Sequence, residues 1–153
     1  MNQELTSTIN QSELSHLRHE LRTPINAIIG YSEMLMEDFT DEELSTNELE
    51  KIQSQGNELL SRVNRILEPI TSSLNYCSLD SQEILETSSS IQDVVTNCEQ
   101  LLVDVDDEDY QQDISKIKTS AHNLQNLLTE LLNSCLQIQS IDFVNYELMF
   151  LFC

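Results

Sequence analysis

The sequence predicts an all-α protein, a four-helix bundle built from two antiparallel helical hairpins. The chain has 153 residues, of which two are glycine, two are proline and 39% are hydrophobic. So few turn residues argue against a sheet with many hairpins. Four segments also carry apolar residues at alternating spacings of three and four, the pattern of a helix that buries one face in a bundle. A chain of this length can bury roughly two-thirds of its unfolded surface in one compact domain.

The first hairpin is predicted over residues 1–69. The apolar face of its first helix contains Leu14, Leu17, Leu21, Ile25, Ile28, Ser32 and Leu35. The apolar face of its second helix contains Leu49, Ile52, Gly56, Leu59, Val63 and Ile66. The polar and acidic stretch 39–47 between them predicts a short connection. Pro69 is expected to end the second helix because its ring nitrogen has no hydrogen to donate.

The second hairpin is predicted over residues 79–140, after a polar linker over 70–78. The apolar face of its first helix contains Ile84, Ser88, Ile91, Val95, Cys98, Leu102 and Val105. That of its second helix contains Ile114, Ile117, Ala121, Leu124, Leu128, Leu131, Cys135 and Ile138. Asp80, with Glu83 three residues later, is typical of a helix start. The later carboxylates of the acidic turn 104–109 suit the start of the next helix.

An apolar and aromatic tail, IDFVNYELMFLFC, follows over residues 141–153. It is expected to fold back on the bundle as a cap. A docking segment and the start of a truncated domain are the two alternatives.

Residues that carry chemistry gather in the first helix, in the stretch LRHELRTPINAIIGYSEML over 17–35. His19 is followed directly by Glu20, and Thr23 lies one turn further along the same face, with Asn26 continuing the stripe. A nucleophilic imidazole beside a carboxylate, with a hydroxyl in reach, suits phosphoryl chemistry. The heptad position of His19 is the one farthest from the buried face, so its side chain is expected to face solvent.

Three neighbouring residues complete the candidate site. Arg18 and Arg22 place positive charge where an incoming phosphoryl group would need it. Pro24 cannot donate a hydrogen bond to the carbonyl of Glu20, and it is predicted to bend the helix just after the nucleophile. His16 is expected to be only a solvated neighbour of this site.

The stretch 17–35 resembles the phosphoacceptor motif of sensor histidine kinases, in their dimerisation and histidine-phosphotransfer domain (HisKA or DHp). The resemblance is strong over 17–35, moderate through 67 and weak in the second hairpin. It implies that His19 is phosphorylated on a ring nitrogen and that Glu20 accepts or positions the other ring proton. It also implies that Thr23 orients water when a response regulator is dephosphorylated, and that Mg²⁺ is bound by a partner receiver domain rather than by this chain.

The sequence also departs from that family. A complete histidine kinase continues into an ATP-binding domain with glycine-rich motifs. The two glycines here, Gly30 and Gly56, both lie inside predicted helices. Autonomous kinase activity is therefore not expected.

The two predicted hairpins align with each other. Residues 25–38 match 91–104 at an offset of 66, and residues 51–67 match 116–132 at an offset of 65. Two consecutive helices that align in order favour an internal duplication over chance similarity. Histidine kinases pair two hairpins from two chains, so this chain is expected to complete the bundle alone as a pseudo-dimeric monomer, with a homodimer as the alternative. The counterpart of His19 is then Leu85.

Composition excludes several other classes of function. The chain has 27 acidic residues against seven Lys or Arg, a formal net charge of −20, and such a field repels nucleic acid and anionic membrane surfaces. The four cysteines are far apart and show no metal-ligand spacing, so no metal or cofactor and a reducing, cytoplasmic setting are expected. The N-terminal MNQELTSTIN lacks the features of a signal peptide, and no segment approaches the roughly 18 apolar residues of a membrane span.

The predicted function is two-component signalling without ATP chemistry. His19 would accept or relay a phosphoryl group to or from a receiver-domain aspartate or a separate kinase, with regulator dephosphorylation as a further activity of the same site. Whether the chain acts as an enzyme is left open. The alternative is a non-catalytic helical interaction module that inhibits or scaffolds a kinase or a response regulator. A third interpretation is a helical fragment of a larger sensor.

Overall fold

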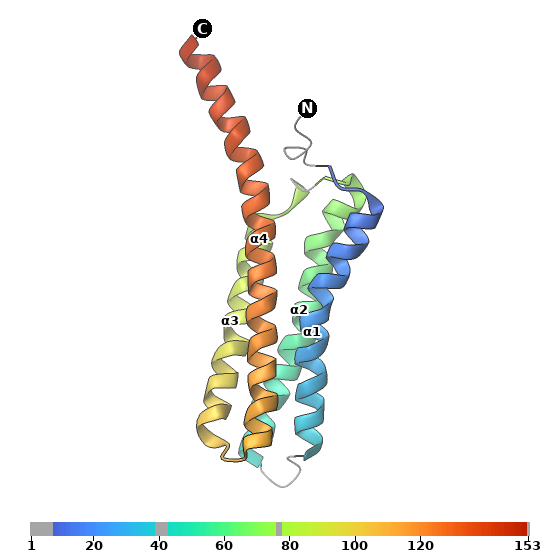
Figure 1. Cartoon of the computed structure of the whole chain (residues 1–153), viewed down its shortest axis with the longest axis vertical. Helices are drawn as coiled ribbons and strands as arrows, with labels where there is room; N and C mark the ends of the chain where they lie inside the picture. The colour runs from blue at the N-terminus through green and yellow to red at the C-terminus, as the bar shows by residue number, and fades with distance from the viewer. Residues whose placement is uncertain (1–7, 39–42, 76–77, 153) are drawn as a thin grey trace.

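The chain folds into an up-and-down bundle of four helices (Figure 1). The structure is a computed structural model that describes residues 8–38, 43–75 and 78–152, with side chains placed for 8–38, 47–75 and 78–135. The helices are α1 (Gln11–Asp38), α2 (Glu43–Ser73), α3 (Ser81–Asp104) and α4 (Glu108–Phe152). α1 packs against α2 and α4, and α3 packs against the same two helices. The predicted all-α four-helix bundle is confirmed, and α4 lies beside α1.

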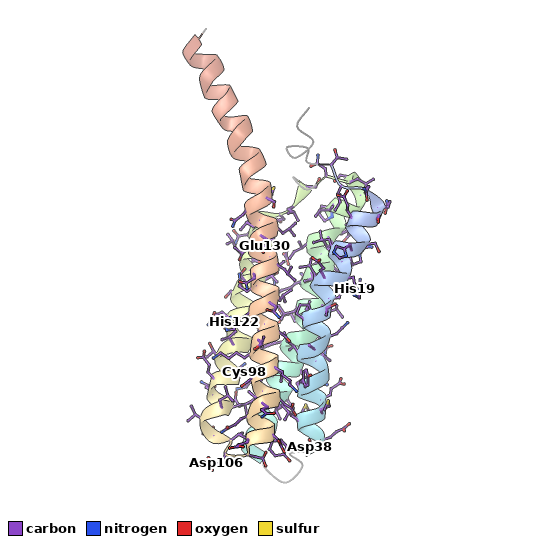
Figure 2. The ribbon with its side chains drawn as sticks, in the orientation of Figure 1. His19, Asp38, Cys98, Asp106, His122 and Glu130 are labelled. Carbon is purple, nitrogen blue, oxygen red and sulfur yellow. The ribbon has the colours of Figure 1, made fainter. Side chains whose placement is uncertain are left out.

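Polar side chains start three of the helices. The carboxylate of Asp80 accepts hydrogen bonds from the backbone N–H groups of Gln82 and Glu83, at 3.0 and 3.4 Å. In the turn after α3, which contains Asp106 (Figure 2), Asp107 does the same for the first turn of α4. Asn10 accepts a 2.8 Å bond from the N–H of Glu13 at the start of α1. These bonds satisfy donors that have no partner inside the helix, which is why the chain enters each helix at these points.

α2 does not end at Pro69 but continues to Ser73, so that prediction is wrong. Proline removes one backbone donor, and the hydroxyls of Thr71 and Ser73 add hydrogen bonds of 2.9 and 2.8 Å to carbonyls of the same turns. The helix ends where Leu74 adopts a positive φ of 53°. The N–H of Ile9 donates to the carbonyl of Leu74 at 2.9 Å, so the chain before α1 is tied to the end of α2.

α4 is longer than predicted. It continues as one helix through residues 141–152 and extends beyond the ends of the other three helices (Figure 1). The expectation that this tail folds back as a cap is therefore wrong, because no glycine or proline interrupts the helix after Glu108. Cys153 lies outside the described residues. Within those residues, no helix combines the length and the apolar character that a membrane span requires.

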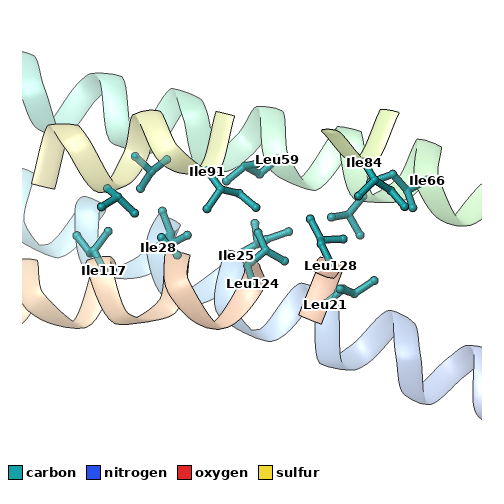
Figure 3. Close-up of a cluster of buried hydrophobic side chains, with 14 of the residues drawn as sticks. Leu21, Ile25, Ile28, Leu59, Ile66, Ile84, Ile91, Ile117, Leu124 and Leu128 are labelled. Carbon is teal, nitrogen blue, oxygen red and sulfur yellow. The ribbon is translucent and has the colours of Figure 1, made fainter. Parts of the chain in front are cut away.

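The core consists of the apolar faces that the sequence predicts, with a wider stripe on some helices (Figure 3). Each helix touches two neighbours, so it buries more than a single row of residues. The helix residues buried beyond the predicted rows are Pro24, Leu67, Ile70, Thr87, Val94 and Leu101. Conversely, Leu17, Ser88 and Leu102 are only partly buried, and the side chain of Ile138 lies outside the described residues.

The two hairpins bury corresponding positions. Along α1 and α3, 66 residues apart, the buried pairs are Leu21/Thr87, Ile25/Ile91, Ile28/Val94, Ser32/Cys98 and Leu35/Leu101. Along α2 and α4, 65 residues apart, they are Leu49/Ile114, Ile52/Ile117, Gly56/Ala121, Leu59/Leu124, Val63/Leu128, Ile66/Leu131 and Ile70/Cys135. The alignment of the two halves in sequence is therefore also an alignment of their core positions, and α1–α4 and α3–α2 are equivalent contacts in the bundle.

Candidate functional site

His19 lies on α1 (Figure 2). It is at the edge of an open groove between α1 and α4. The groove has a volume of about 370 Å³. The residues that line it are His19, Glu20, Thr23, Pro24 and Ala27 from α1 and Ser120, Asn123 and Leu127 from α4. The predicted nucleophile, carboxylate and hydroxyl thus lie together, and a second helix completes their surroundings.

The side chain of His19 is exposed, as its heptad position predicts. Thr23 is exposed as well, and its hydroxyl donates a 2.9 Å hydrogen bond to the backbone carbonyl of His19. A threonine hydroxyl has one hydrogen and two lone pairs. With the hydrogen used on the backbone, the lone pairs of Thr23 are left to accept a hydrogen bond from a water molecule.

The carboxylate of Glu20 contacts His16 instead of His19. Its Oε1 lies 2.6 Å from Nε2 of His16, and the two side chains are 42% and 71% exposed. Residues four apart on a helix face each other, whereas adjacent residues do not. His16 is therefore a direct partner of the site's carboxylate and not merely a solvated neighbour, and the spacing of four was visible in the sequence.

Arg18 and Arg22 lie on another face of α1. On a helix of 3.6 residues per turn they are about 100° and 60° away from His19. Arg18 donates a 2.9 Å hydrogen bond to the hydroxyl of Thr71, and Arg22 donates one of 3.0 Å to the side-chain oxygen of Asn64. Both arginines line a separate groove of about 390 Å³ between α1 and α2. The structure therefore places their charge beside the His19 groove and not inside it.

Pro24 is buried, and α1 continues through it as one helix. Because proline has no N–H, it cannot donate to the carbonyl of Glu20, one turn before. Asn26 is exposed and is not among the residues that line the groove. A bend of α1 at Pro24 and a binding role for Asn26 stay predictions.

Sequence reasoning missed the α4 side of the groove. Ser120, Asn123 and Leu127 belong to no motif, and their proximity to His19 depends on the packing of α4 against α1. The repeat was the one available signal, because a second hairpin that completes the bundle brings its last helix beside the first. None of these three residues is charged, so Glu20 is the charged carboxylate that lines this groove.

No group of three or more His, Cys, Asp or Glu side chains in the part of the chain that the structure describes could hold a metal ion. Cys98 and Cys135 are buried in the core and form no disulfide with each other. Burial raises the pKa of the Cys98 thiol to about 12, against a smaller opposing effect of the Lys118 ammonium. Such a thiol stays protonated and is a poor ligand and nucleophile at neutral pH.

A comparison with protein families finds a match in the first half of the chain. Residues 9–70, which contain α1 and most of α2, match the family described as "His Kinase A (phospho-acceptor) domain". No curated protein and no solved structure matches the chain. The match includes the exposed histidine, the neighbouring carboxylate and the hydroxyl one turn later.

Proposed function

We propose, from the premise that residues 9–70 are a His Kinase A phospho-acceptor domain, that this chain exchanges phosphoryl groups with receiver domains. The domain has a phospho-acceptor role in two-component signalling. The proposed acceptor atom is a ring nitrogen of His19. The observation that carries the proposal is the exposed imidazole at an open groove, with the Glu20 carboxylate and the Thr23 hydroxyl on the same groove.

In the proposed transfer, a lone pair of the His19 imidazole attacks the phosphorus of an aspartyl phosphate on the receiver. The bond between phosphorus and the aspartate oxygen breaks, and the carboxylate leaves. The reverse reaction returns the phosphoryl group to the aspartate. Mg²⁺ held by the receiver would neutralise charge on the phosphoryl oxygens.

Glu20 is proposed to set the tautomer and basicity of the imidazole, as a neighbouring carboxylate does for a catalytic histidine. That role requires the carboxylate to leave His16, since the two side chains are paired in the structure. Thr23 is proposed to hold the water that attacks the receiver's aspartyl phosphate. Its donated bond to the carbonyl of His19 fixes the direction of its lone pairs.

A second candidate is a non-catalytic module that binds a kinase or a response regulator. The observation that favours it is the pairing of Glu20 with His16, which leaves the imidazole of His19 without the adjacent carboxylate in this arrangement. The position of Arg18 and Arg22 on the α1–α2 face points the same way, because a phosphoryl group at His19 would not meet their charge directly.

One experiment separates the two candidates. The purified chain is incubated with a panel of phosphorylated receiver domains and with active histidine kinase catalytic domains, and acid-labile phosphate on the chain is measured. Phosphate on the wild type and none on His19→Gln supports phosphotransfer. Binding without phosphate, which persists when His19, Glu20 and Thr23 are all replaced by inert residues, supports the module.

The setting proposed for this exchange is a reducing one, such as the cytoplasm. Cys98 and Cys135 are buried in the core as thiols and not as a disulfide. Free thiols persist in compartments that keep cysteines reduced.

A further inference from the structure

The bundle has two equivalent places at which a partner domain could dock. One is the His19 groove between α1 and α4. At the offsets of 66 and 65, α1 corresponds to α3 and α4 corresponds to α2. The second place is therefore the contact between α3 and α2, whose buried positions match those of the first place pair by pair. In that second place Leu85, Glu86 and Ser89 stand where the first has His19, Glu20 and Thr23. From the other helix come Gln55, Glu58 and Arg62, the counterparts of Ser120, Asn123 and Leu127.

An ion-pair cluster lies across the α2–α3 place. The guanidinium of Arg62 is within 3.2 Å of Glu58, 3.4 Å of Glu83 and 3.8 Å of Glu86. The Arg62 side chain is only 18% exposed and that of Glu83 only 20%, so this part of the cluster is packed between the helices. Arg65 adds a second cation, 3.8 Å from Glu83. We call Arg62, Glu58, Glu83 and Glu86 the Arg62 cluster.

No such cluster occurs among the described residues of the α1–α4 groove. Leu127 occupies the position of Arg62, Asn123 that of Glu58, and Leu17 that of Glu83. The carboxylate that corresponds to Glu86 is Glu20, which contacts His16 on its own helix and so does not cross to α4. α4 therefore offers a neutral, partly apolar wall beside His19 in a chain of net charge −20.

We infer that the chain binds one receiver domain, on the α1–α4 face, with Asn123 and Leu127 forming part of the docking surface, while the Arg62 cluster closes the equivalent α2–α3 face. The inference rests on the proposed function for the identity of its partner. Its chemical basis is charge. A phosphorylated aspartate approaches His19 past the uncharged side chains of α4. At the α2–α3 face it would meet no histidine, and the Arg62 guanidinium there is already paired with three carboxylates.

This arrangement gives the second hairpin a function beyond completing the core. In a symmetric pair of identical hairpins, both docking faces would carry the same residues. Here the two hairpins carry different residues at these positions, so residues of α4 can select the partner without a change in α1. Specificity for the receiver is thus expected to depend on Asn123 and Leu127 as well as on α1.

The test introduces the charged pair of the α2–α3 face into the α1–α4 groove, in a double variant that we call the transplant variant. Asn123→Glu together with Leu127→Arg reproduces, on α4, the Glu58–Arg62 pair of α2, and the new guanidinium is placed to bridge to Glu20. The matched control is His122→Glu with Asn126→Arg, which adds the same charges at exposed positions outside the groove. The probe is the receiver domain of the panel that binds the wild type most tightly, titrated by calorimetry whether or not it transfers phosphate.

The expected results are one receiver per chain, a loss of affinity of about tenfold or more in the transplant variant, and unchanged affinity in the control. Leu85→Arg on the α2–α3 face is also expected to leave affinity unchanged. Thermal unfolding by circular dichroism shows whether each variant is folded. If the transplant variant does not fold, Asn123→Glu alone is used. Asn123 is exposed, and the same loss of receiver affinity is expected.

Two bound receivers per chain, wild-type affinity in the transplant variant, or an equal loss from Leu85→Arg would each overturn the inference. Binding that follows all the expectations while His19 never acquires phosphate would overturn only the proposed phosphotransfer. If no receiver in the panel binds the wild type, the docking proposal fails as well.

Discussion

Glu20 Oε1 lies 2.6 Å from Nε2 of His16, so the carboxylate next to His19 is held by an imidazole of the preceding turn. Side chains four residues apart meet on one face of a helix, and adjacent ones diverge by about 100°. Under the proposed function, His16 and His19 therefore compete for this one carboxylate. The His16–Glu20 contact follows from the spacing of four residues between them on α1.

Replacing His16 tests that competition. His16→Gln removes a partner of Glu20, so the carboxylate is free to turn toward His19, and the rate of His19 phosphorylation by a phosphorylated receiver is expected to rise several-fold. Glu20→Ala is expected to lower the same rate by about a hundredfold, the usual effect of removing a positioned acid–base group. Rapid-quench measurements with acid-labile phosphate as the readout check both. A slower rate in His16→Gln would show instead that His16 assists the reaction.

His19→Gln is expected to abolish acid-labile phosphorylation without harming the fold. The side chain is exposed, and exposed substitutions usually change the free energy of unfolding by less than about 0.5 kcal/mol. Urea unfolding measures the stability, and incubation with phosphorylated receivers measures the phosphate. Acid-labile phosphate that persists in the variant would place the acceptor elsewhere, with His16 and His122 as the remaining histidines.

Thr23→Ala is expected to lower the rate of receiver dephosphorylation more than the rate of His19 phosphorylation. The Thr23 hydroxyl donates a hydrogen bond to the backbone carbonyl of His19. From this position it can hold a water, but this hydrogen bond does not involve the ring nitrogen that attacks. Thr23→Ser keeps the hydroxyl and serves as the control. Equal losses in both rates would argue for a general disturbance of α1, and no loss in either would exclude a role in water positioning.

The two glycines are expected to respond differently to substitution by alanine. A Cβ at Gly30 would meet nothing within 4 Å, so Gly30→Ala should stabilise the fold by about 0.5–1 kcal/mol through helix propensity. A Cβ at Gly56 would lie 2.8 Å from Cγ1 of Ile29 and 3.3 Å from Cγ2 of Ile28. Gly56→Ala is therefore expected to be about 1–3 kcal/mol less stable than Gly30→Ala. Thermal unfolding of the two variants checks the order, and equal stabilities would contradict this close contact of α1 and α2.

Cys98 predicts a loss of stability at high pH. Burial raises its pKa to about 12, whereas in the unfolded chain the thiol ionises near its ordinary value of 9.0. Between these values the unfolded state releases a proton that the folded state keeps, so the free energy of unfolding falls as pH rises from 9 toward 12. Cys98→Val lacks this contribution. The stability difference between wild type and variant should be constant below pH 9 and should shift toward the variant above it, as urea unfolding at several pH values would show.

Several features of this protein are determined locally and could be read from the sequence. The helical segments, the rows of core residues such as Leu21, Ile25 and Ile28, and the exposure of His19 follow from the 3.6-residue period of a helix. Asp80 and the acidic turn before α4 were identifiable as helix starts because a capping side chain acts on its own neighbours. Local rules failed at Pro69, where the helix continues with one backbone donor missing.

The tertiary structure alone decided which surfaces meet. That Ser120, Asn123 and Leu127 of α4 line the His19 groove depends on the order of helices around the bundle. The direction of Arg18 and Arg22, toward Thr71 and Asn64 of α2, depends on which side of α1 that helix covers. The contact of Arg62 on α2 with Glu83 and Glu86 on α3 has the same origin. A helix period states which residues face inward or outward, but partners from distant parts of the chain are selected by packing, and packing is a property of the whole bundle.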